Sequence, residues 1–389
     1  MKPIVIVGTG LAGYTTAREI RRHDPDTPMV LVSADDATSY SKPMLSTAMT
    51  RGKSAADLAQ ASADAMAEQY DARVLPHTRV RALDADALQV ELDSGENLSA
   101  SAVVLAVGAE QIDPGLAGNA ADQVFAVNDL TAYAELRTAL TDAHRIVIIG
   151  GGLIGCEFAN DWQRAGYEVT IVEPQPYPLG RMLPELAGNT LAASLRAEGI
   201  TIATGAFAER VEHDGDHLVV HDSAGGTHEA DVVVRAIGLQ PRTELAAAAG
   251  LETRRGIVTD RHLQTSASGI HALGDCAEVD GLVLPFIMPI NQCARALGQT
   301  LSGTPTAVEY PVMPVIVKTS CCPIQLYAPP ADTPGTWQEE DVEGGGTRSL
   351  FREADGNLRG FVLTGAAVRE KAEWAREVPG YFDNRNGAA

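Results

Sequence analysis

"IVIVGTGLAGYTTAREI", residues 4–20, indicates the fold of this chain close to its first residue. The apolar run 4–7 predicts a buried strand, glycines follow at positions 8, 10 and 13, and the remainder predicts a helix. A nearly identical pattern returns as "RIVIIGGGLIGCEFAND", residues 145–161, where the apolar run 146–149 is the predicted strand. A G-x-G-x-x-G loop between a strand and a helix is typical of a site for a dinucleotide phosphate. One copy alone is also compatible with a structural glycine-rich turn, but two matched copies predict two dinucleotide sites.

Each glycine of such a loop has its own physical task. The first makes the tight turn, the second lets backbone N–H groups approach a pyrophosphate, and the third lets the helix pack on the strand. The pyrophosphate then lies at the positive end of the helix dipole. The predicted binding residues are Gly8, Thr9, Gly10, Leu11, Ala12 and Gly13 in the first loop, and Gly150, Gly152, Leu153, Ile154 and Gly155 in the second.

The two copies differ at the end of the next strand. "YEVTIVE", residues 167–173, predicts a strand that ends in Glu173, where a carboxylate accepts hydrogen bonds from a ribose 2′-OH and repels a 2′-phosphate. The second site is therefore predicted to bind NADH in preference to NADPH, although a plain surface carboxylate would show the same pattern. In the first copy, "PMVLVSADD", residues 28–36, has Ser33 and Ala34 at this point and Asp35 one place late. There a serine hydroxyl or the backbone is expected to replace the acid.

Length, charge and cysteine usage exclude several classes of function. The chain has 389 residues, which predicts two or three domains. Its 30 basic and 51 acidic residues, a formal net charge of −21, disfavour nucleic acid or an anionic membrane as a partner. No apolar stretch predicts membrane insertion, and a strand that begins within three residues leaves no room for a signal peptide, so we expect a cytoplasmic protein. The five cysteines show no zinc or C-x-x-C spacing, so no metal site and no redox pair are predicted.

Three further segments complete the pattern. "SAVVLAVGAE" (101–110) and "ADVVVRAIGLQPRTEL" (230–245) are buried strands that end in small residues, which let the chain pass close to a cofactor. "TSASGIHALGDCAEV" (265–279) is a loop, a buried strand and then a Gly-Asp pair. A strand, a phosphate loop, an inserted second unit and a Gly-Asp pair are the layout of flavoproteins with two dinucleotides.

The whole chain resembles the FAD-dependent pyridine nucleotide–disulfide reductase superfamily, in the branch that reduces iron–sulfur or iron proteins, and within it the rubredoxin reductases. The stretches "SYSKPMLST" (39–47), "CEFANDW" (156–162), "ALGDCAEVDGL" (272–282), "PVIVKT" (314–319) and "LTGAAVREK" (363–371) carry the resemblance. It implies an α/β fold with two Rossmann-like dinucleotide-binding domains, glutathione-reductase-like, and a small α+β C-terminal domain. The implied domains are a discontinuous FAD domain (1–112 and 235–310), an NAD domain (113–234) and a C-terminal interface domain (311–389).

The resemblance also assigns roles to single residues. Lys42 and Lys318 are the candidate catalytic residues, because a lysine beside a reduced flavin stabilises its negative charge. The further implied FAD contacts are Val80 at the adenine end, Glu157 near the flavin and its lysine, Asp275 at the ribityl chain or pyrophosphate, and Ile287 at the ring. Residue by residue the alternatives stay open: solvated surface lysines, a helix-surface glutamate and an aspartate that only caps a turn.

One departure separates this chain from related thiol enzymes. Related NADH oxidases, peroxidases and coenzyme A disulfide reductases carry a redox cysteine in the segment that here reads "SYSKPML" (39–45), where this chain has none. Electrons from NADH are therefore expected to leave from FAD itself, one at a time, to rubredoxin. The alternatives are a ferredoxin reductase of an oxygenase system, an NADH oxidase, or a flavin-binding redox sensor. Because NADH, rubredoxin and this chain are all anionic, we expect docking at a local basic or neutral patch, with Lys42, Lys318, Arg51 and Lys53 as candidates, or else mainly apolar contact.

The remaining pattern gives local expectations. Residues 54–69 are Ala-rich and predict a surface helix, and 311–319 predicts a strand. Residues 349–365 predict two strands joined by a tight turn at 355–357, and 366–376 predicts a helix. Residues 329–347 are predicted to be a long polar loop and the last residues to be frayed.

Overall fold

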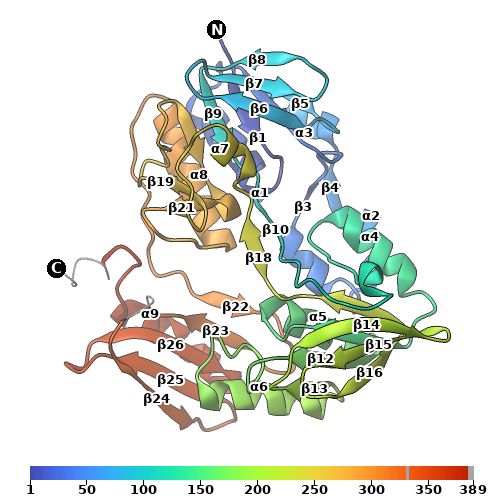
Figure 1. Cartoon of the computed structure of the whole chain (residues 1–389). Coiled ribbons are helices and arrows are strands. Elements are labelled where there is room, and N and C mark those ends of the chain that lie inside the picture. Colours follow the sequence, from blue (N-terminus) through green and yellow to red (C-terminus); the bar gives the residue numbers. More distant parts are fainter. Residues whose placement is uncertain (330–332, 384–389) are drawn as a thin grey trace. The chain divides into compact units, whose positions relative to one another are not determined.

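The computed structural model of the chain describes residues 1–329 and 333–383 (Figure 1). It contains two compact units, each assembled from three separate stretches of chain. The first unit comprises Met1–Lys42, Asp57–Glu110 and Leu239–Tyr310. The second comprises Pro43–Ala56, Gln111–Gly238 and the residues from Pro311 onward.

A parallel five-stranded sheet forms the centre of the first unit. Its order is β20 (Ile270–Ala272), β9 (Ala102–Leu105), β1 (Ile4–Val7), β2 (Met29–Val32) and β5 (Arg73–Leu75). All four residues of β1 and of β2 are buried, as expected of parallel strands covered on both faces. Helix α1 (Leu11–His23) packs closely on α8 (Ile287–Leu301): a Cβ on Gly298 would lie 2.6 Å from the Cβ of Glu19. Only glycine allows the two helices to approach this far.

Smaller elements complete the first unit. An antiparallel sheet is formed by β6 (Val80–Asp84), β7 (Gln89–Leu92) and β8 (Asn97–Ser99). The other elements are β3 (Ser39–Tyr40) with β4 (Ala59–Ala61), β19 (Ile257–Thr259) with β21 (Ala277–Val279), β10 (Ala109–Gln111) with β18 (Leu239–Pro241), α3 (Ala63–Tyr70), α7 (Glu244–Ala248) and the 3₁₀ turn η3 (Gly274–Cys276).

The second unit contains a second parallel sheet of the same kind. Its order is β13 (Thr201–Thr204), β12 (Glu168–Glu173), β11 (Arg145–Ile149) and β17 (Val232–Arg235). Three antiparallel strands, β14 (Ala208–Asp214), β15 (His217–Asp222) and β16 (Thr227–Ala230), share its apolar core. The helices of this part are α4 (Leu130–Ala139), α5 (Leu153–Arg164) and α6 (Glu185–Ala197), with a 3₁₀ turn η2 (Ala121–Gln123).

The C-terminal part of the second unit is an antiparallel sheet. Its order is β22 (Val315–Val317), β23 (Ile324–Tyr327), β26 (Leu358–Thr364), β25 (Thr347–Arg352) and β24 (Thr336–Asp341), seen as the orange and red strands of Figure 1. A 3₁₀ turn η4 (Gly365–Glu370) and helix α9 (Lys371–Glu377) follow. Tyr327, Phe361 and Leu363 are fully buried and form the core of this sheet. Strand β22 is an edge strand, and its Ile316 is exposed.

The strands and helices on either side of both glycine loops are confirmed, and so is the hairpin β25–β26. Of the strand predicted over 311–319, only β22, Val315–Val317, is formed. The single helix predicted over 54–69 is wrong. The segment contains α2 (Ala55–Leu58), then β4, which pairs with β3, and then α3, which begins where the Ser62 side chain accepts a hydrogen bond from the backbone N–H of Ala65. Strand pairing and the cap together override the helical pattern of alanines.

Two other predictions need correction. The segment 329–347 is not wholly a loop, because β24 pairs with β25 along its length; residues 330–332 lie outside the described part. The helix predicted over 366–376 begins as the 3₁₀ turn η4. The predicted frayed end, 384–389, lies outside the described residues. The division into three domains stays a prediction. The two compact units have other boundaries, and residues 43–56 belong to the second unit.

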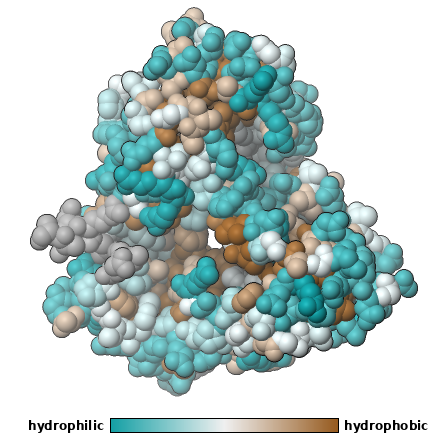
Figure 2. All heavy atoms as spheres, viewed as in Figure 1, coloured by the Kyte–Doolittle hydropathy of each residue, from teal (hydrophilic) through white to brown (hydrophobic). Residues whose placement is uncertain are grey.

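Hydrophilic side chains cover most of the face shown in Figure 2, in keeping with a chain of which 21% is charged. Over residues 1–329 and 333–383, no helix has both the length and the apolar character required to cross a bilayer. The same residues contain no group of three or more His, Cys, Asp or Glu suited to a metal ion.

Candidate cofactor and electron-transfer site

The first glycine loop joins β1 to α1 and is shaped by steric need. Gly8 has φ +110°, and a Cβ there would lie 2.3 Å from the carbonyl oxygen of Ala106. A Cβ on Gly13 would lie 1.9 Å from the carbonyl oxygen of Gly8, so the helix packs directly on the turn. By contrast, a Cβ on Gly10 would meet nothing within 4 Å, and Gly10 caps α1 without any side-chain hydrogen bond. The open space and the uncapped helix N-terminus together suit an anionic group.

The side chains around this loop form a small polar group at the end of β2. The hydroxyls of Thr9 and Ser33 are buried and 2.6 Å apart. Ser33 also donates a hydrogen bond to Asp35 at 2.5 Å, and the backbone N–H of Ala37 donates to the same carboxylate oxygen at 2.9 Å. Ala34 is exposed and offers no polar side-chain atom. The polar atoms at this strand end thus come from Ser33 and Asp35.

Turn η3 lies against the same loop. A Cβ on Gly274, which has φ +81°, would lie 2.8 Å from the Cβ of Ala12. The next residue, Asp275, has a carboxylate oxygen, Oδ1, that is shielded from solvent and has no hydrogen-bond partner among the described residues. Burial raises the pKa of Asp275, and the nearby Lys42 ammonium partly opposes this. This oxygen lies beside the open phosphate loop and lacks a hydrogen-bond donor. A polar ligand such as FAD would supply that donor.

The remaining predicted residues of the first unit are dispersed over four elements. Lys42 is exposed at the start of the 3₁₀ turn η1 (Lys42–Thr47). Val80 is the first residue of β6 and pairs with Leu92. Ile287 is the exposed first residue of α8, whose N-terminus has no side-chain cap. Leu11 and Ala12 are the first two residues of α1.

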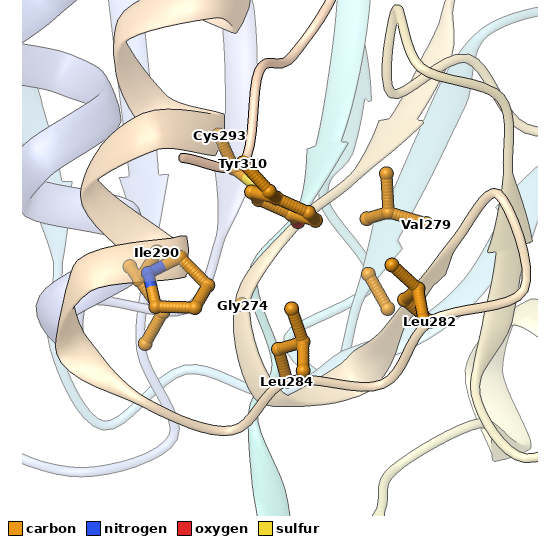
Figure 3. Close-up of a pocket in the computed structure, with 9 residues that line it drawn as sticks. Gly274, Val279, Leu282, Leu284, Ile290, Cys293 and Tyr310 are labelled. Atoms are coloured by element: carbon orange, nitrogen blue, oxygen red, sulfur yellow. The ribbon is translucent and has the colours of Figure 1, made fainter. Parts of the chain in front are cut away.

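A small cavity lies beside η3. Figure 3 shows the side chains of Val279, Leu282 and Leu284 directed toward it, with Cys293 and Tyr310 at one edge. The Cys293 thiol and the Tyr310 hydroxyl are 3.0 Å apart. The volume of this cavity is about 10 Å³, room for about one water molecule and not for a ligand.

The second glycine loop repeats the geometry of the first. Gly150 has φ +105°, and a Cβ there would lie 2.7 Å from the carbonyl oxygen of Ala236. A Cβ on Gly155 would lie 2.0 Å from the carbonyl oxygen of Gly150, whereas one on Gly152 would meet its nearest atom only at 3.8 Å. Gly152 is the cap of α5 and, like Gly10, has no side-chain hydrogen bond there. Leu153 and Ile154 are the first two residues of α5 and are half-buried.

Glu173, the last residue of β12, contacts this loop directly. Its carboxylate accepts hydrogen bonds from the backbone N–H of Gly151 at 2.5 Å and of Gln175 at 2.8 Å. A cavity of about 330 Å³ lies beside Gly150 and is lined by Pro174, Phe207 and other residues. Phe207 is 55% exposed, an unusual state for a phenylalanine, and the sequence analysis did not single it out. The signal that could have identified Phe207 in the sequence is an aromatic residue a few positions after a predicted strand.

Glu157 and Lys318 meet in the second unit, although they are far apart in the sequence. Lys318 Nζ lies 2.7 Å from Glu157 Oε2, and the Lys318 backbone N–H donates to Glu157 Oε1 at 2.9 Å. Lys318 Nζ also donates to the carbonyl oxygen of Pro43 at 2.6 Å and to Ser46 Oγ at 2.8 Å. Ser46 in turn donates to Glu157 Oε2 at 2.6 Å.

This cluster has no unused donor on its lysine. An ammonium group has three N–H donors, and Lys318 has three acceptors, Pro43, Ser46 and Glu157. Glu157 is 1% exposed and Lys318 33% exposed in their side chains. The positive charge is therefore balanced within the cluster. Sequence reasoning selected both charged residues but missed Ser46 and the carbonyl group of Pro43, which no charge or spacing pattern marks.

Comparison with known proteins agrees with this geometry. Residues 2–300 match the family model of pyridine nucleotide-disulphide oxidoreductases, and residues 307–378 match the model of a rubredoxin binding C-terminal domain. The chain belongs to the pyridine nucleotide-disulphide oxidoreductase family.

More specific relatives extend over nearly the whole chain. It is 46% identical over 380 residues to the rubredoxin-NAD(+) reductase of Alcanivorax borkumensis, covering 97% of this chain and 99% of the relative. It is 42% identical over 387 residues to the rubredoxin-NAD(+) reductase of Acinetobacter baylyi, covering 97% and 98%. Among solved structures, the ferredoxin reductase for the CYP199A2 system from Rhodopseudomonas palustris matches with a TM-score of 0.87 at 25% identity, covering 100% of both chains.

Proposed function

We propose that this chain oxidises NADH and passes the electrons, through FAD, to rubredoxin one at a time. The observation that carries the proposal is the pair of helix N-termini at Gly10 and Gly152, which have no side-chain cap. Each lies in a glycine loop whose first and third glycines leave no room for a Cβ. The relatives that span the whole chain carry the name rubredoxin-NAD(+) reductase, and the sheet that contains β22–β26 matches a rubredoxin binding domain. We also propose that the protein works in the cytoplasm, where NADH is supplied.

The residues of the first unit fit FAD. We assign the phosphate groups to the loop Gly8–Gly13, where backbone N–H groups and the helix dipole favour an anion. The shielded Oδ1 of Asp275 supplies an acceptor for a hydroxyl group of the same ligand. Further contacts are proposed for Thr9, Leu11, Ala12, Ser33, Ala34, Lys42, Val80 and Ile287. FAD, when bound, accepts a hydride as a pair of electrons and can release these electrons singly.

NADH is assigned to the second glycine loop. Residues Gly150–Gly155 would hold its pyrophosphate, with contacts from Gly152, Leu153 and Ile154. Glu173 would accept hydrogen bonds from a ribose hydroxyl while it keeps its bond to the Gly151 backbone. A 2′-phosphate beside this carboxylate would be repelled, which supports NADH over NADPH.

The state of the cysteines supports transfer without sulfur. All five, Cys156, Cys276, Cys293, Cys321 and Cys322, are free thiols, and four of them are buried. Burial raises the pKa of the Cys276 thiol to about 11 and that of Cys321 to about 11. A thiol with so high a pKa holds little thiolate at neutral pH and exchanges slowly with disulfides. An electron acceptor that is itself a one-electron centre fits this chain better than a disulfide.

Lys42 and Lys318 are proposed to act by charge and position, with Glu157 as the partner of Lys318. Lys42 is exposed, as is Arg51, and no acidic residue occurs between Asp36 and Asp57. We propose that this basic stretch, with Lys53, receives the anionic rubredoxin. Lys318 contributes less to docking because its ammonium group is engaged within its own cluster.

The proposal is tested by a direct comparison of acceptors. The purified protein is reduced with NADH without oxygen and then mixed separately with rubredoxin, with a [2Fe–2S] ferredoxin and with air. Fastest reoxidation by rubredoxin is the expected result. Fastest reoxidation by ferredoxin would replace the proposal by the second candidate, a ferredoxin reductase, which the similarity to the R. palustris structure favours. Fastest reoxidation by air would make the protein an NADH oxidase.

A further inference from the structure

Helix α5 carries two buried polar residues that the proposed function does not use. Asn160 and Asp161 are 2% and 5% exposed. They follow Glu157 by three and four positions, so all three side chains lie on one face of the helix. Such a face would normally be apolar when buried, and its polar atoms therefore need partners from other segments.

Asp161 holds the segment that follows η1. Its Oδ2 accepts a hydrogen bond from the backbone N–H of Met49 at 2.8 Å, and its Oδ1 accepts one from the backbone N–H of Thr50 at 3.1 Å. The Thr50 hydroxyl donates to the same Oδ1. Asp161 forms no ion pair within residues 1–329 and 333–383. Its charge is stabilised by these three donors, which fixes the backbone at positions 49 and 50.

The held segment supplies two acceptors of the Lys318 ammonium group. Ser46 and Pro43 lie three and six residues before Met49, in the 3₁₀ turn η1 that leads into this loop. The loop is closed further along by hydrogen bonds from Gly52 to Met49 and from Lys53 to Ala48. Fixing Met49 and Thr50 therefore limits how far Pro43 and Ser46 can move from Lys318.

Asn160 holds the other side of the same lysine. Its Oδ1 accepts hydrogen bonds from the backbone N–H of Ser320 at 2.6 Å and from Ser320 Oγ at 2.9 Å. Ser320 is two residues after Lys318, in the connection between β22 and β23. Two consecutive side chains of α5 thus fix the two segments between which the lysine side chain lies.

We propose that Asn160 and Asp161 are positioning residues that keep the Lys318–Glu157 pair in one arrangement. The inference rests on the proposed function, in which this pair supports the reaction by charge and position. A lysine side chain has four rotatable bonds and loses its geometry easily when its acceptors move. Helix α5 begins at the loop assigned to NADH, so one helix carries that loop, the glutamate and both positioning residues.

The test uses the holoenzyme and a matched pair of variants. Asp161→Asn keeps the size of the side chain but turns one acceptor oxygen into an NH₂ donor that faces a backbone N–H. The control is Asp231→Asn, because Asp231 also accepts backbone N–H bonds in the second unit, from His144 and Arg145, at 2.8 Å each. Both variants are measured by amide hydrogen exchange and by steady-state kinetics with rubredoxin.

We expect Asp161→Asn to speed exchange over residues 44–52 by about tenfold or more. We expect kcat to fall by about fivefold or more while KM for NADH stays within about twofold, because the Asp161 carboxylate accepts its hydrogen bonds from Met49 and Thr50 and not from the glycine loop. Asp231→Asn should leave kcat within about twofold while exchange rises at residues 144–145. Thr50→Val, which keeps both backbone bonds of Asp161, should lie between wild type and Asp161→Asn.

Two results would overturn the inference. Unchanged exchange over 44–52 in Asp161→Asn would show that the contact does not hold the segment. Faster exchange with unchanged kcat would show that the contact is structural only. Ferricyanide, as a second one-electron acceptor, separates failure of this inference from failure of the proposed function. A wild-type protein that reduces ferricyanide but not rubredoxin refutes the proposed function. The effect of Asp161→Asn on the rate of ferricyanide reduction still tests the positioning role.

Discussion

At the scale of single residues, Glu157 is the most constrained ionisable group of the candidate site. It is 1% exposed, and its carboxylate accepts bonds from Lys318 and Ser46. A buried charge that loses its partner is strongly destabilising, whereas loss of both partners together costs much less. Removal of Lys318 alone should therefore destabilise the second unit more than removal of both charges together.

Lys318→Met tests this dependence. We expect a loss of about 2–3 kcal/mol in the free energy of unfolding, somewhat below the roughly 3–5 kcal/mol for breaking a fully buried pair, because Lys318 is partly exposed. The double variant Lys318→Met with Glu157→Gln should recover most of that loss. Urea denaturation gives both values, with Lys371→Met as a control that should cost no more than about 0.5 kcal/mol. Equal losses in the single and double variants would contradict the argument.

His271, in β20 directly before η3, gives a prediction for pH. Burial lowers its pKa, and its Nδ1 atom has no hydrogen-bond partner among the described residues. The unfolded chain therefore binds a proton more readily than the folded chain, so stability falls as the pH drops through about 6.5, the ordinary pKa of histidine. In His271→Asn the fall in Tm between pH 7.5 and 5 should be smaller than in wild type. Parallel pH curves for the two proteins would refute this assignment.

At the scale of elements, the glycine loops show how much of the fold could be predicted. A strand, three spaced glycines and a helix form a local pattern, and the steric need for Gly8 and Gly13 is visible only once the strand and helix are placed. The 54–69 segment could not be predicted, because β4 forms by pairing with β3 about 20 positions earlier. Asp161 could not be selected either, because its partners Met49 and Thr50 are more than 100 residues away.

The middle and last glycines of the first loop, Gly10 and Gly13, should behave differently on substitution by alanine. A Cβ at Gly13 meets backbone at 1.9 Å, so Gly13→Ala should unfold the loop and lower Tm even without FAD. A Cβ at Gly10 meets nothing of the protein, so Gly10→Ala should keep the Tm of the flavin-free protein and lose affinity for FAD. Thermal unfolding and flavin titration of each variant check this. A similar Tm loss in both flavin-free variants would contradict the ligand assignment.

At the scale of the whole molecule, the main question is how a chain of net charge −21 receives an anionic protein. The stretch from Ala37 to Ala56 carries three basic residues and no acidic one, and Arg51 within it is exposed. A basic stretch of this kind, as a docking site, would govern encounter and partner choice more than total affinity. Charge counting along the sequence could identify this stretch, but not that the Lys318 ammonium is already engaged.

Arg51→Gln is expected to raise KM for rubredoxin about threefold or more and to weaken the dependence of the rate on salt. KM for NADH should not change. Arg196→Gln, an exposed arginine in the last turn of α6, is the matched control for charge alone. Stopped-flow rates at low and moderate salt give the answer, and equal effects of both variants would place rubredoxin elsewhere.

The interleaved order of the two units has a consequence for synthesis on the ribosome. Strand β20 and helix α8 of the first unit come after the whole of residues 111–238, which belong to the second. During synthesis the N-terminal sheet therefore stays incomplete. The edge of β9 has no partner strand until about 165 later residues have emerged and β20 can pair with it. No single break in the gene would yield either unit intact, so a gene for one unit alone has to join that unit's three separate stretches.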